Sequence, residues 1–457
     1  MTTSDPTRPA LKEAEKDRGG LGEVWFLAYP AILSQVSVTT MGVVDSAMVG
    51  RLGATELASV GFAGIWNWTL ICAFLGMASV VQTFVSQDHG AGRGRQCGAW
   101  TWQGVWLLTP MLILLAVAVL LFAEPLLRAL NLSPAMQPFA AEYLSIRAFG
   151  GVGLCMASIF FSFYRGIGDT RTPLVITVFV NIVNVVLDYG LIFGRIGLPA
   201  WGVAGAATAT VIAEWTSTAL VLFLLLRPRV QERFGTGPIR PRWKDQLRLL
   251  RTGLPLGGAA LLEMSSFAAF LTFVAWMGDS SMAASQAFVS LLSMSFMQAV
   301  GIGYAVTTLV GRYRASNDLP AATRSFYSSQ KLAAAISIVT GLIFIIFPEP
   351  LMRIFTNDPQ VIALGRPLLL IGAFYEILDA FSIVADGALR GAGDTGAPFV
   401  ARLLLAWLVQ VPLAWLIGIH WEWGLTGAWL GSGVYMVLLS AYLLFRFRSG
   451  AWQKIKI

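Results

Sequence analysis

The sequence predicts an all-α integral membrane protein, with twelve transmembrane helices in two six-helix lobes related by a pseudo-two-fold axis along the membrane normal. Hydrophobic residues make up 56% of the chain and charged residues only 12%. Apolar runs long enough to cross ~30 Å of hydrocarbon recur along the whole chain. The second half also repeats the first at a nearly constant offset, and these three features together define the predicted fold.

Apolar runs of roughly 20 residues mark the predicted transmembrane helices, because a helix of that length crosses the hydrocarbon core. The predicted spans cover residues 27–49, 57–81, 99–123, 137–164, 173–194, 202–226, 252–277, 282–308, 328–348, 361–388, 398–419 and 424–446. Residues 1–24 are polar and lack the hydrophobic core of a signal peptide. We therefore expect cytoplasmic tails at both ends, residues 1–24 and 449–457.

Lys and Arg are distributed unequally between the two sets of loops. Of the 32 basic residues, 25 fall in the tails and in the loops after even-numbered spans, and five fall in the loops after odd-numbered spans. Basic residues are retained on the cytoplasmic side of short loops, so both termini should face the cytoplasm of a plasma or inner membrane. The net charge of +7 then reflects topology and does not indicate nucleic-acid binding.

Two stretches 225 residues apart reveal an internal repeat, namely FYRGIGDTRTP from Phe163 and ALRGAGDTGAP from Ala388. The same offset aligns Pro30 with Pro255, Gly76 with Gly301 and Pro173 with Pro398. Because six is an even number of spans, the halves have the same orientation, a recurrent plan of secondary transporters. The predicted lobes are residues 25–226 and 251–448, joined by a basic cytoplasmic linker at 227–250.

The repeated RGxGDT turn is expected to end the fourth and tenth spans. Glycine permits a sharp reversal, and Pro173 or Pro398 opens the next helix. A phosphate-binding loop is disfavoured, because the lysine and the strand of a P-loop are missing. The Arg and Asp of each copy could instead form contacts of a cytoplasmic gate, and this alternative stays open.

Acidic residues deep in the spans are costly to insert, so they are candidates for functional sites. Asp45 lies 15 residues after Pro30, and Asp188 lies 15 residues after Pro173, so both should lie roughly 22 Å beyond the proline at ~1.5 Å per residue. Asn184 shares a helix face with Asp188. These three side chains predict an oxygen-rich site for a proton or a sodium ion.

A second set of oxygen-bearing residues lies in the second half of the chain. Glu263 and Asp379 should lie at similar depths, roughly 12 and 16 Å from the inner surface. Tyr375 is one turn from Asp379 and adds a phenolic oxygen on the same face. These residues predict a sodium site or a site for the substrate's charge. The alternative for any one of these acids is a carboxylate that only holds helices together.

The remaining charges in or near the spans are expected to be structural. Arg147 should lie near the outer interface with Glu142 as a neighbour, Asp386 should pair with Arg390, and Arg402 should reach the inner interface. Two further acids, Glu214 and Glu376, have no evident partner in the sequence.

The sequence contains few residues of the kinds that enzymes use for catalysis. The chain has only two histidines, both in or near predicted loops, and three cysteines that fit small buried residues. No His/Cys metal cluster and no Ser/His/Asp arrangement is apparent. We therefore expect no enzymatic activity, no cofactor and no bound metal other than the coupling ion.

These motifs, in this order, resemble those of multidrug and toxic compound extrusion (MATE) transporters. The resemblance runs from about Trp25 to Arg448. VDSAMVGRLGATELASVG, GIGDTRTP and NIVNVVLDYGLIFG are similar to the bacterial DinF-type branch. GLPLGGAALLE and YEILDAFSIVADGALRG are similar to the NorM-type branch. The resemblance implies a cation or proton site at the first-lobe residues Asp45, Asn184 and Asp188, and C-lobe cation residues at Glu263, Tyr375 and Asp379.

The resemblance also implies a secondary active antiporter, which exports organic and often cationic compounds in exchange for H⁺ or Na⁺. Trp66, Met294 and Met297 could supply adaptable apolar walls to a substrate cavity between the lobes. We expect a monomer in the lipid bilayer with small-molecule substrates. A flippase for lipid-linked precursors is the alternative, although its pyrophosphate substrate would need a cationic cavity and the deep charges here are mostly acids.

Overall fold

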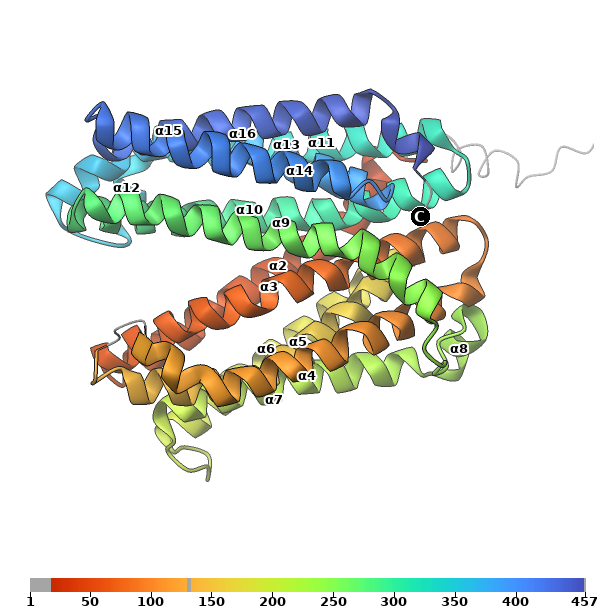
Figure 1. Ribbon diagram of the computed structural model, residues 1–457, viewed down its shortest axis with the longest axis horizontal. Coiled ribbons are helices and arrows are strands. Elements are labelled where there is room, and N and C mark those ends of the chain that lie inside the picture. The colour runs from red at the N-terminus through yellow and green to blue at the C-terminus, as the bar shows by residue number, and fades with distance from the viewer. Residues whose placement is uncertain (1–17, 130–132, 456–457) are drawn as a thin grey trace, which may run out of the picture. The chain divides into compact units, whose positions relative to one another are not determined.

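The computed structural model describes residues 18–129 and 133–455, and these residues form helices joined by loops (Figure 1). Residues 1–17 and 456–457 of the predicted tails lie outside the described residues. The main helices are α2 (Leu21–Gly50), α3 (Ala54–Gly90), α4 (Cys97–Ala129), α5 (Gln137–Gly166), α6 (Arg171–Phe193), α7 (Gly202–Leu225), α8 (Pro228–Phe234), α9 (Trp243–Trp276), α10 (Asp279–Ala315), α11 (Leu319–Ile346), α12 (Pro348–Arg353), α13 (Pro359–Gly391) and α16 (Gly424–Arg448). Among the described residues, twelve helical segments are long and apolar enough to cross a membrane, which confirms the predicted fold class.

The eleventh span is not a uniform α-helix. It consists of α14 (Gly396–Leu405), a π-helical segment at Ala406–Gln410, α15 (Val411–Trp415) and a second π-helical segment at Leu416–His420. Pro412 lies between the π segments and has no N–H for the regular helical hydrogen bond. Widened turns of this kind occur frequently at functional sites.

Contacts divide the chain into two compact units. Of the described residues, unit 1 comprises 18–32, 86–92 and 262–455, and unit 2 comprises 33–85 and 93–261. Three helices therefore contribute to both units: α2 changes unit after Ile32, α3 after Val85 and α9 after Leu261. The lobe boundaries predicted from the repeat describe internal symmetry, and they remain a prediction.

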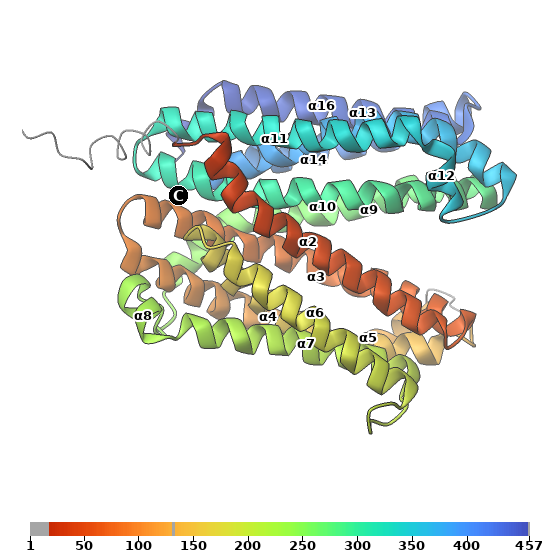
Figure 2. The same ribbon diagram turned by 180° about the vertical axis from the view of Figure 1, so that it is seen from behind.

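Unit 1 is built around α13, which packs against α10, α11 and α16 (Figure 2). Small and aliphatic side chains fill this core, among them Ala305, Val306 and Val384. The first turns of α2 join the same core through Val24 and Leu27. In unit 2, α5 takes the central position and packs against α4 and α7, while α6 packs against α7.

Glycines at equivalent repeat positions allow close helix contacts in each unit. A Cβ atom on Gly76 of α3 would lie 2.8 Å from the backbone oxygen of Leu256 in α9. A Cβ atom on Gly301 of α10 would lie 2.7 Å from the backbone nitrogen of Ile32 in α2. The first half of α9 therefore packs closely in unit 2, and the first half of α2 packs closely in unit 1.

The two copies of the RGxGDT turn have the same backbone conformation. Gly168 has φ 87° and Gly393 has φ 85°, a left-handed conformation that glycine adopts without strain. Asp169 accepts hydrogen bonds from the backbone nitrogens at the start of α6, at 3.0 and 3.1 Å. Asp394 instead forms an ion pair of 2.8 Å with Arg446 of α16. These contacts favour the interpretation of the turn as a helix end.

The predicted linker at 227–250 is ordered and packs on α4. It forms α8 and an extended segment, followed by the first turns of α9. Trp102, Gln103 and Trp106 of α4 donate side-chain hydrogen bonds of 2.8–3.0 Å to backbone oxygens of this segment. The segment is therefore fixed to unit 2 by its own backbone.

Candidate cation sites

The first predicted site is formed in unit 2, where α2 supplies Asp45 and α6 supplies Asn184 and Asp188. The amide nitrogen of Asn184 donates to Asp45 Oδ1 at 2.9 Å and to Asp188 Oδ2 at 2.6 Å. Asn184 and Asp188 are fully buried, and Asp45 is half-buried. The structure thus brings together all three residues that the depth counts placed at one level.

Two oxygen atoms in this site lack a donor. Asn184 Oδ1 and Asp188 Oδ1 are buried and have no hydrogen-bond partner among the residues that the structure describes. The Asp45 and Asp188 carboxyl groups also lie within hydrogen-bonding reach of each other. Two carboxylates at such close range resist joint ionisation, so one proton is readily held between them. The arrangement suits a proton or a small cation.

A series of polar contacts between α2 and α6 extends from this site, and the sequence analysis missed it. Ser34 donates to Thr177 at 3.2 Å, and Asn181 donates to Ser37 at 2.6 Å. The α6 members, Thr177, Asn181, Asn184 and Asp188, recur at helical spacing on one face. That spacing was the signal in the sequence that could have revealed the series.

Arg147 does not have the neighbour that the sequence predicted. Its guanidinium forms a bidentate ion pair with the carboxylate of Glu214 on α7, with N···O distances of 2.7 and 2.8 Å. Both side chains are about nine-tenths buried. Gly150 makes room for this pair, because a Cβ atom there would collide with Glu214 and lie 2.8 Å from Arg147. The prediction of Glu142 was wrong because it considered only the sequence neighbourhood of Arg147.

The second predicted site lies in unit 1, beside a cavity of about 150 Å³. The lining residues are Glu263, Phe296, Val300, Tyr304, Asp379, Ser382, Ile383, Asp386, Arg390, Arg402, Tyr435, Met436 and Leu439. Glu263 and Asp379 thus meet at one cavity, as predicted. Tyr375 is not among the lining residues, and its ring lies edge-on to Trp429 at 6.2 Å. Tyr375 therefore does not line the cavity, although it lies one turn before Asp379 on α13.

Arg402 belongs to the same cavity, against expectation. Its guanidinium lies 3.0 Å from Glu263 Oε2 and 3.5 Å from Asp386 Oδ1, and only 15% of its side chain is exposed. Two carboxylates, on α9 and α13, hold its guanidinium in unit 1, and its reach to the inner interface stays a prediction. Asp386 was expected to pair with Arg390, and the structure places it on Arg402. Nothing in the local sequence of Arg402 indicated a partner on α9.

The other predicted residues are distributed between the units. Glu376 is buried in α13 and hydrogen-bonds Ser295 of α10. Trp66 is half-buried in unit 2 and Met297 is half-buried in unit 1, while the side chain of Met294 lies outside the described part of the chain. Their role as walls of a substrate cavity therefore remains a prediction.

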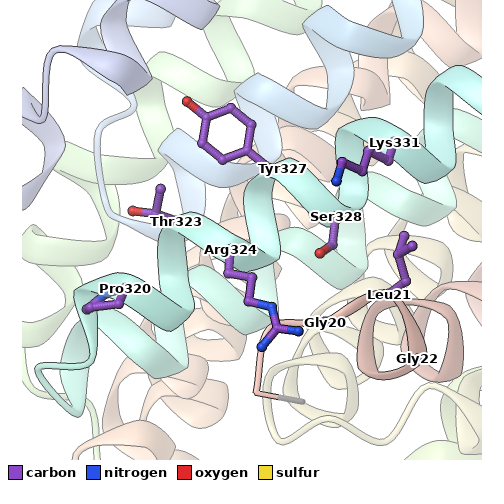
Figure 3. A pocket seen from close by; sticks show the side chains of 9 residues that line it. All are labelled: Gly20, Leu21, Gly22, Pro320, Thr323, Arg324, Tyr327, Ser328 and Lys331. Carbon is purple, nitrogen blue, oxygen red and sulfur yellow. The ribbon is translucent and has the colours of Figure 1, made fainter. Parts of the chain in front are cut away.

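A larger pocket, of about 600 Å³, lies at the start of α2 and α11 in unit 1 (Figure 3). Arg324 and Lys331 line it together with the hydroxyl groups of Thr323, Tyr327 and Ser328. Its ionisable lining groups include two cations, and it contains none of the predicted acids. This pocket is therefore unsuited to a coupling cation.

Comparisons with known proteins give the relatives of this chain. The sequence model of the MatE family matches two segments, residues 30–190 and 255–416. These segments begin at Pro30 and Pro255, which the 225-residue offset aligns. The comparison therefore detects the same duplication that the sequence analysis found.

Curated relatives match over nearly the full chain. A probable multidrug resistance protein NorM from Thermotoga maritima is 30% identical over 436 residues, covering 94% of this chain and 92% of the relative. The multidrug resistance protein NorM of Burkholderia vietnamiensis is 30% identical over 453 residues, covering 98% of this chain and 97% of the relative. A solved outward-facing structure of a multidrug resistance MATE family transporter has a TM-score of 0.86 at 19% identity, covering 95% of this chain and 97% of that chain. This likeness confirms the fold.

Proposed function

Because this chain belongs to the MatE family, we propose that it is a secondary active multidrug efflux transporter, which exports organic and often cationic compounds in exchange for protons. The relatives named above are multidrug resistance proteins, in agreement with the prediction that the chain is not an enzyme. The observation that carries the proposed coupling is the Asp45–Asn184–Asp188 cluster. It is the buried group of acids best suited to hold and release one proton.

Proton coupling follows from the chemistry of this cluster. The pair of carboxyl groups keeps one proton when both are shielded from water, and it loses that proton when the site opens to a basic medium. The Asn184 amide donates to both acids and so holds the two carboxyl groups close to each other. Uptake and release of that proton would bias α2 and α6 between two arrangements, which is the requirement for exchange.

The acids of unit 1 are assigned to the substrate rather than to the proton. Glu263 has a side chain that is 45% exposed, so it is the acid most accessible to a cationic compound. The net basic charge of the tails and even-numbered loops supports an inner-membrane protein with both termini in the cytoplasm. We further propose that each chain works as a monomer, because the predicted sites lie within single units of one chain.

The coupling is tested in proteoliposomes that contain the purified full chain and a panel of fluorescent organic cations. Efflux is measured under a proton gradient and, separately, under a sodium gradient. Asp45→Asn and Asp188→Asn should each remain folded and inserted but lose proton-driven efflux, because an amide keeps the shape and removes the charge. Glu124→Gln, an exposed acid in an i,i+4 pair on α4, is the matched control and should transport normally. Wild-type efflux by both site variants would remove the cluster from the mechanism.

A further inference from the structure

The acids of the unit 1 cavity already hold a positive charge that belongs to the chain. Arg402 of α14 contacts Glu263 of α9 at 3.0 Å and Asp386 of α13 at 3.5 Å. Asp379 lines the same cavity. Arg402 therefore lies between the carboxylates that a free cation would need.

A guanidinium and a sodium ion make opposite demands on such a cavity. Sodium, like other hard cations, takes oxygen ligands, and it is attracted by an excess of negative charge. Arg402 offers only N–H donors and stays charged at any pH that a protein tolerates. A second cation at Glu263 would lie within a few Å of this fixed positive charge and would be repelled by it.

The arrangement of the acidic side chains favours Arg402 over a sodium ion as their partner. No group of three His, Cys, Asp or Glu side chains in the described part of the chain is arranged to hold a metal ion. Glu263 and Asp386 are instead directed to Arg402. The repeat shows the same distinction between the units, because the offset of 225 aligns Arg402 with Thr177, a hydroxyl residue of the unit 2 polar series.

We propose that Arg402 is a tethered counter-ion that determines ion specificity: its guanidinium occupies the place of a sodium ion at Glu263 and so excludes sodium from unit 1. The inference rests on the proposed transport function only for its role in the cell. Competition between the Arg402 guanidinium and sodium for Glu263 is a property of the cavity itself. The inference is an alternative to the expected sodium site formed by Glu263, Tyr375 and Asp379. The unit 1 acids are then left to an organic cation that can displace the guanidinium from Glu263.

The first experiment measures sodium binding by the purified full chain without any gradient. Binding of radioactive Na⁺ and thermal stabilisation by NaCl, against KCl at equal ionic strength, are compared among variants. The wild type and Arg402→Lys should show no sodium-specific effect, because both keep a positive charge in the cavity. Arg402→Gln should bind sodium at least about tenfold more tightly than the wild type, and Glu263→Gln in the same chain should abolish that gain.

If Arg402→Gln does not fold, the Glu263→Gln single variant still tests the proposal. It should leave sodium binding unchanged, since the proposed site is closed to sodium when Arg402 is present. A Glu263-dependent sodium site in the wild type would overturn the proposal, and so would a folded Arg402→Gln chain with no gain in sodium binding. Loss of proton-driven efflux in the Asp45 and Asp188 variants is a separate measurement, so failure of the proposed function would be recognised independently.

Discussion

Arg147 and Arg402, one in each unit, are held in different ways by neighbouring acids. Arg147 in unit 2 is matched by one acid, Glu214, through two short contacts. Arg402 in unit 1 is shared between Glu263 and Asp386 at longer distances. Its Nε atom has no hydrogen-bond partner among the described residues. The first arginine is therefore fixed by two hydrogen bonds to one acid, whereas the second is divided between two acids and makes one hydrogen bond, to Glu263.

The Arg147–Glu214 pair should be important for stability. Glu214→Gln leaves a buried guanidinium without its counter-charge, and such a change costs about 3–5 kcal/mol. Replacing both residues, Arg147→Met with Glu214→Leu, should cost clearly less than the single change, because no charge is left buried. Thermal unfolding in detergent measures both variants. Equal losses for the single and double variants would show that packing, and not charge pairing, is the contribution of this pair.

Counting residues along the helices predicted the Asp45–Asn184–Asp188 site. It predicted only part of the unit 1 site, namely Glu263 and Asp379. The rise of a helix is fixed, so Asp45 and Asp188 could be placed at one depth from the sequence alone. Depth alone does not say which way a side chain points around its helix. Tyr375 is near the correct level but not in the cavity, and the partner of Arg402 is 139 residues away on another helix. The direction of the Tyr375 side chain and the partner of Arg402 could be found only from the packing of the helices in the structure.

At the scale of helices, close packing depends on glycine at equivalent positions of the two repeats. Gly76 lies against the backbone of α9 in unit 2, and Gly301 lies against the backbone of α2 in unit 1. Both contacts involve backbone atoms, which cannot move aside as the end of a flexible side chain can. Helices in membranes associate through such close approaches of small residues. The repeat therefore preserves the contact that joins each crossing helix to its unit.

Adding a single methyl group should disturb these contacts. Gly76→Ala and Gly301→Ala place a Cβ atom within 3 Å of a backbone atom, and overpacking of this kind costs about 1–3 kcal/mol. Gly64→Ala on the same helix as Gly76 is the control, because a Cβ atom there meets nothing within 4 Å. Melting temperatures in detergent report the difference. A Gly76→Ala chain as stable as Gly64→Ala would contradict the packing account.

At the scale of the whole molecule, the distribution of basic residues and the ordered linker define the expected topology. The linker carries seven basic residues and begins with the largely exposed helix α8. Cys72, Cys97 and Cys155 are all buried, so a cysteine added at the surface would be the accessible thiol among the described residues. This makes topology measurable in the chain with its native cysteines retained.

Arg229→Cys on α8 should react with a membrane-impermeant maleimide only after the cells are opened. Arg195→Cys, in the exposed loop between α6 and α7, should react in intact cells, since it lies after an odd-numbered span. Mass-shift gels of the labelled protein distinguish the two outcomes. Labelling of Arg229→Cys in intact cells would reverse the orientation in which both termini face the cytoplasm.

The helices shared between units have a consequence for synthesis at the ribosome. Unit 1 takes residues up to Ile32 from the start of the chain, but most of it is made only from Leu262 onward. At a synthesis rate of ~5–20 residues per second, roughly 10–50 s pass between synthesis of the first helix and synthesis of the helices that it packs against. Unit 2 likewise is completed only when the first half of α9 emerges. During that interval Val24 and Leu27 of α2 lack the core side chains of unit 1 that they contact in the complete chain.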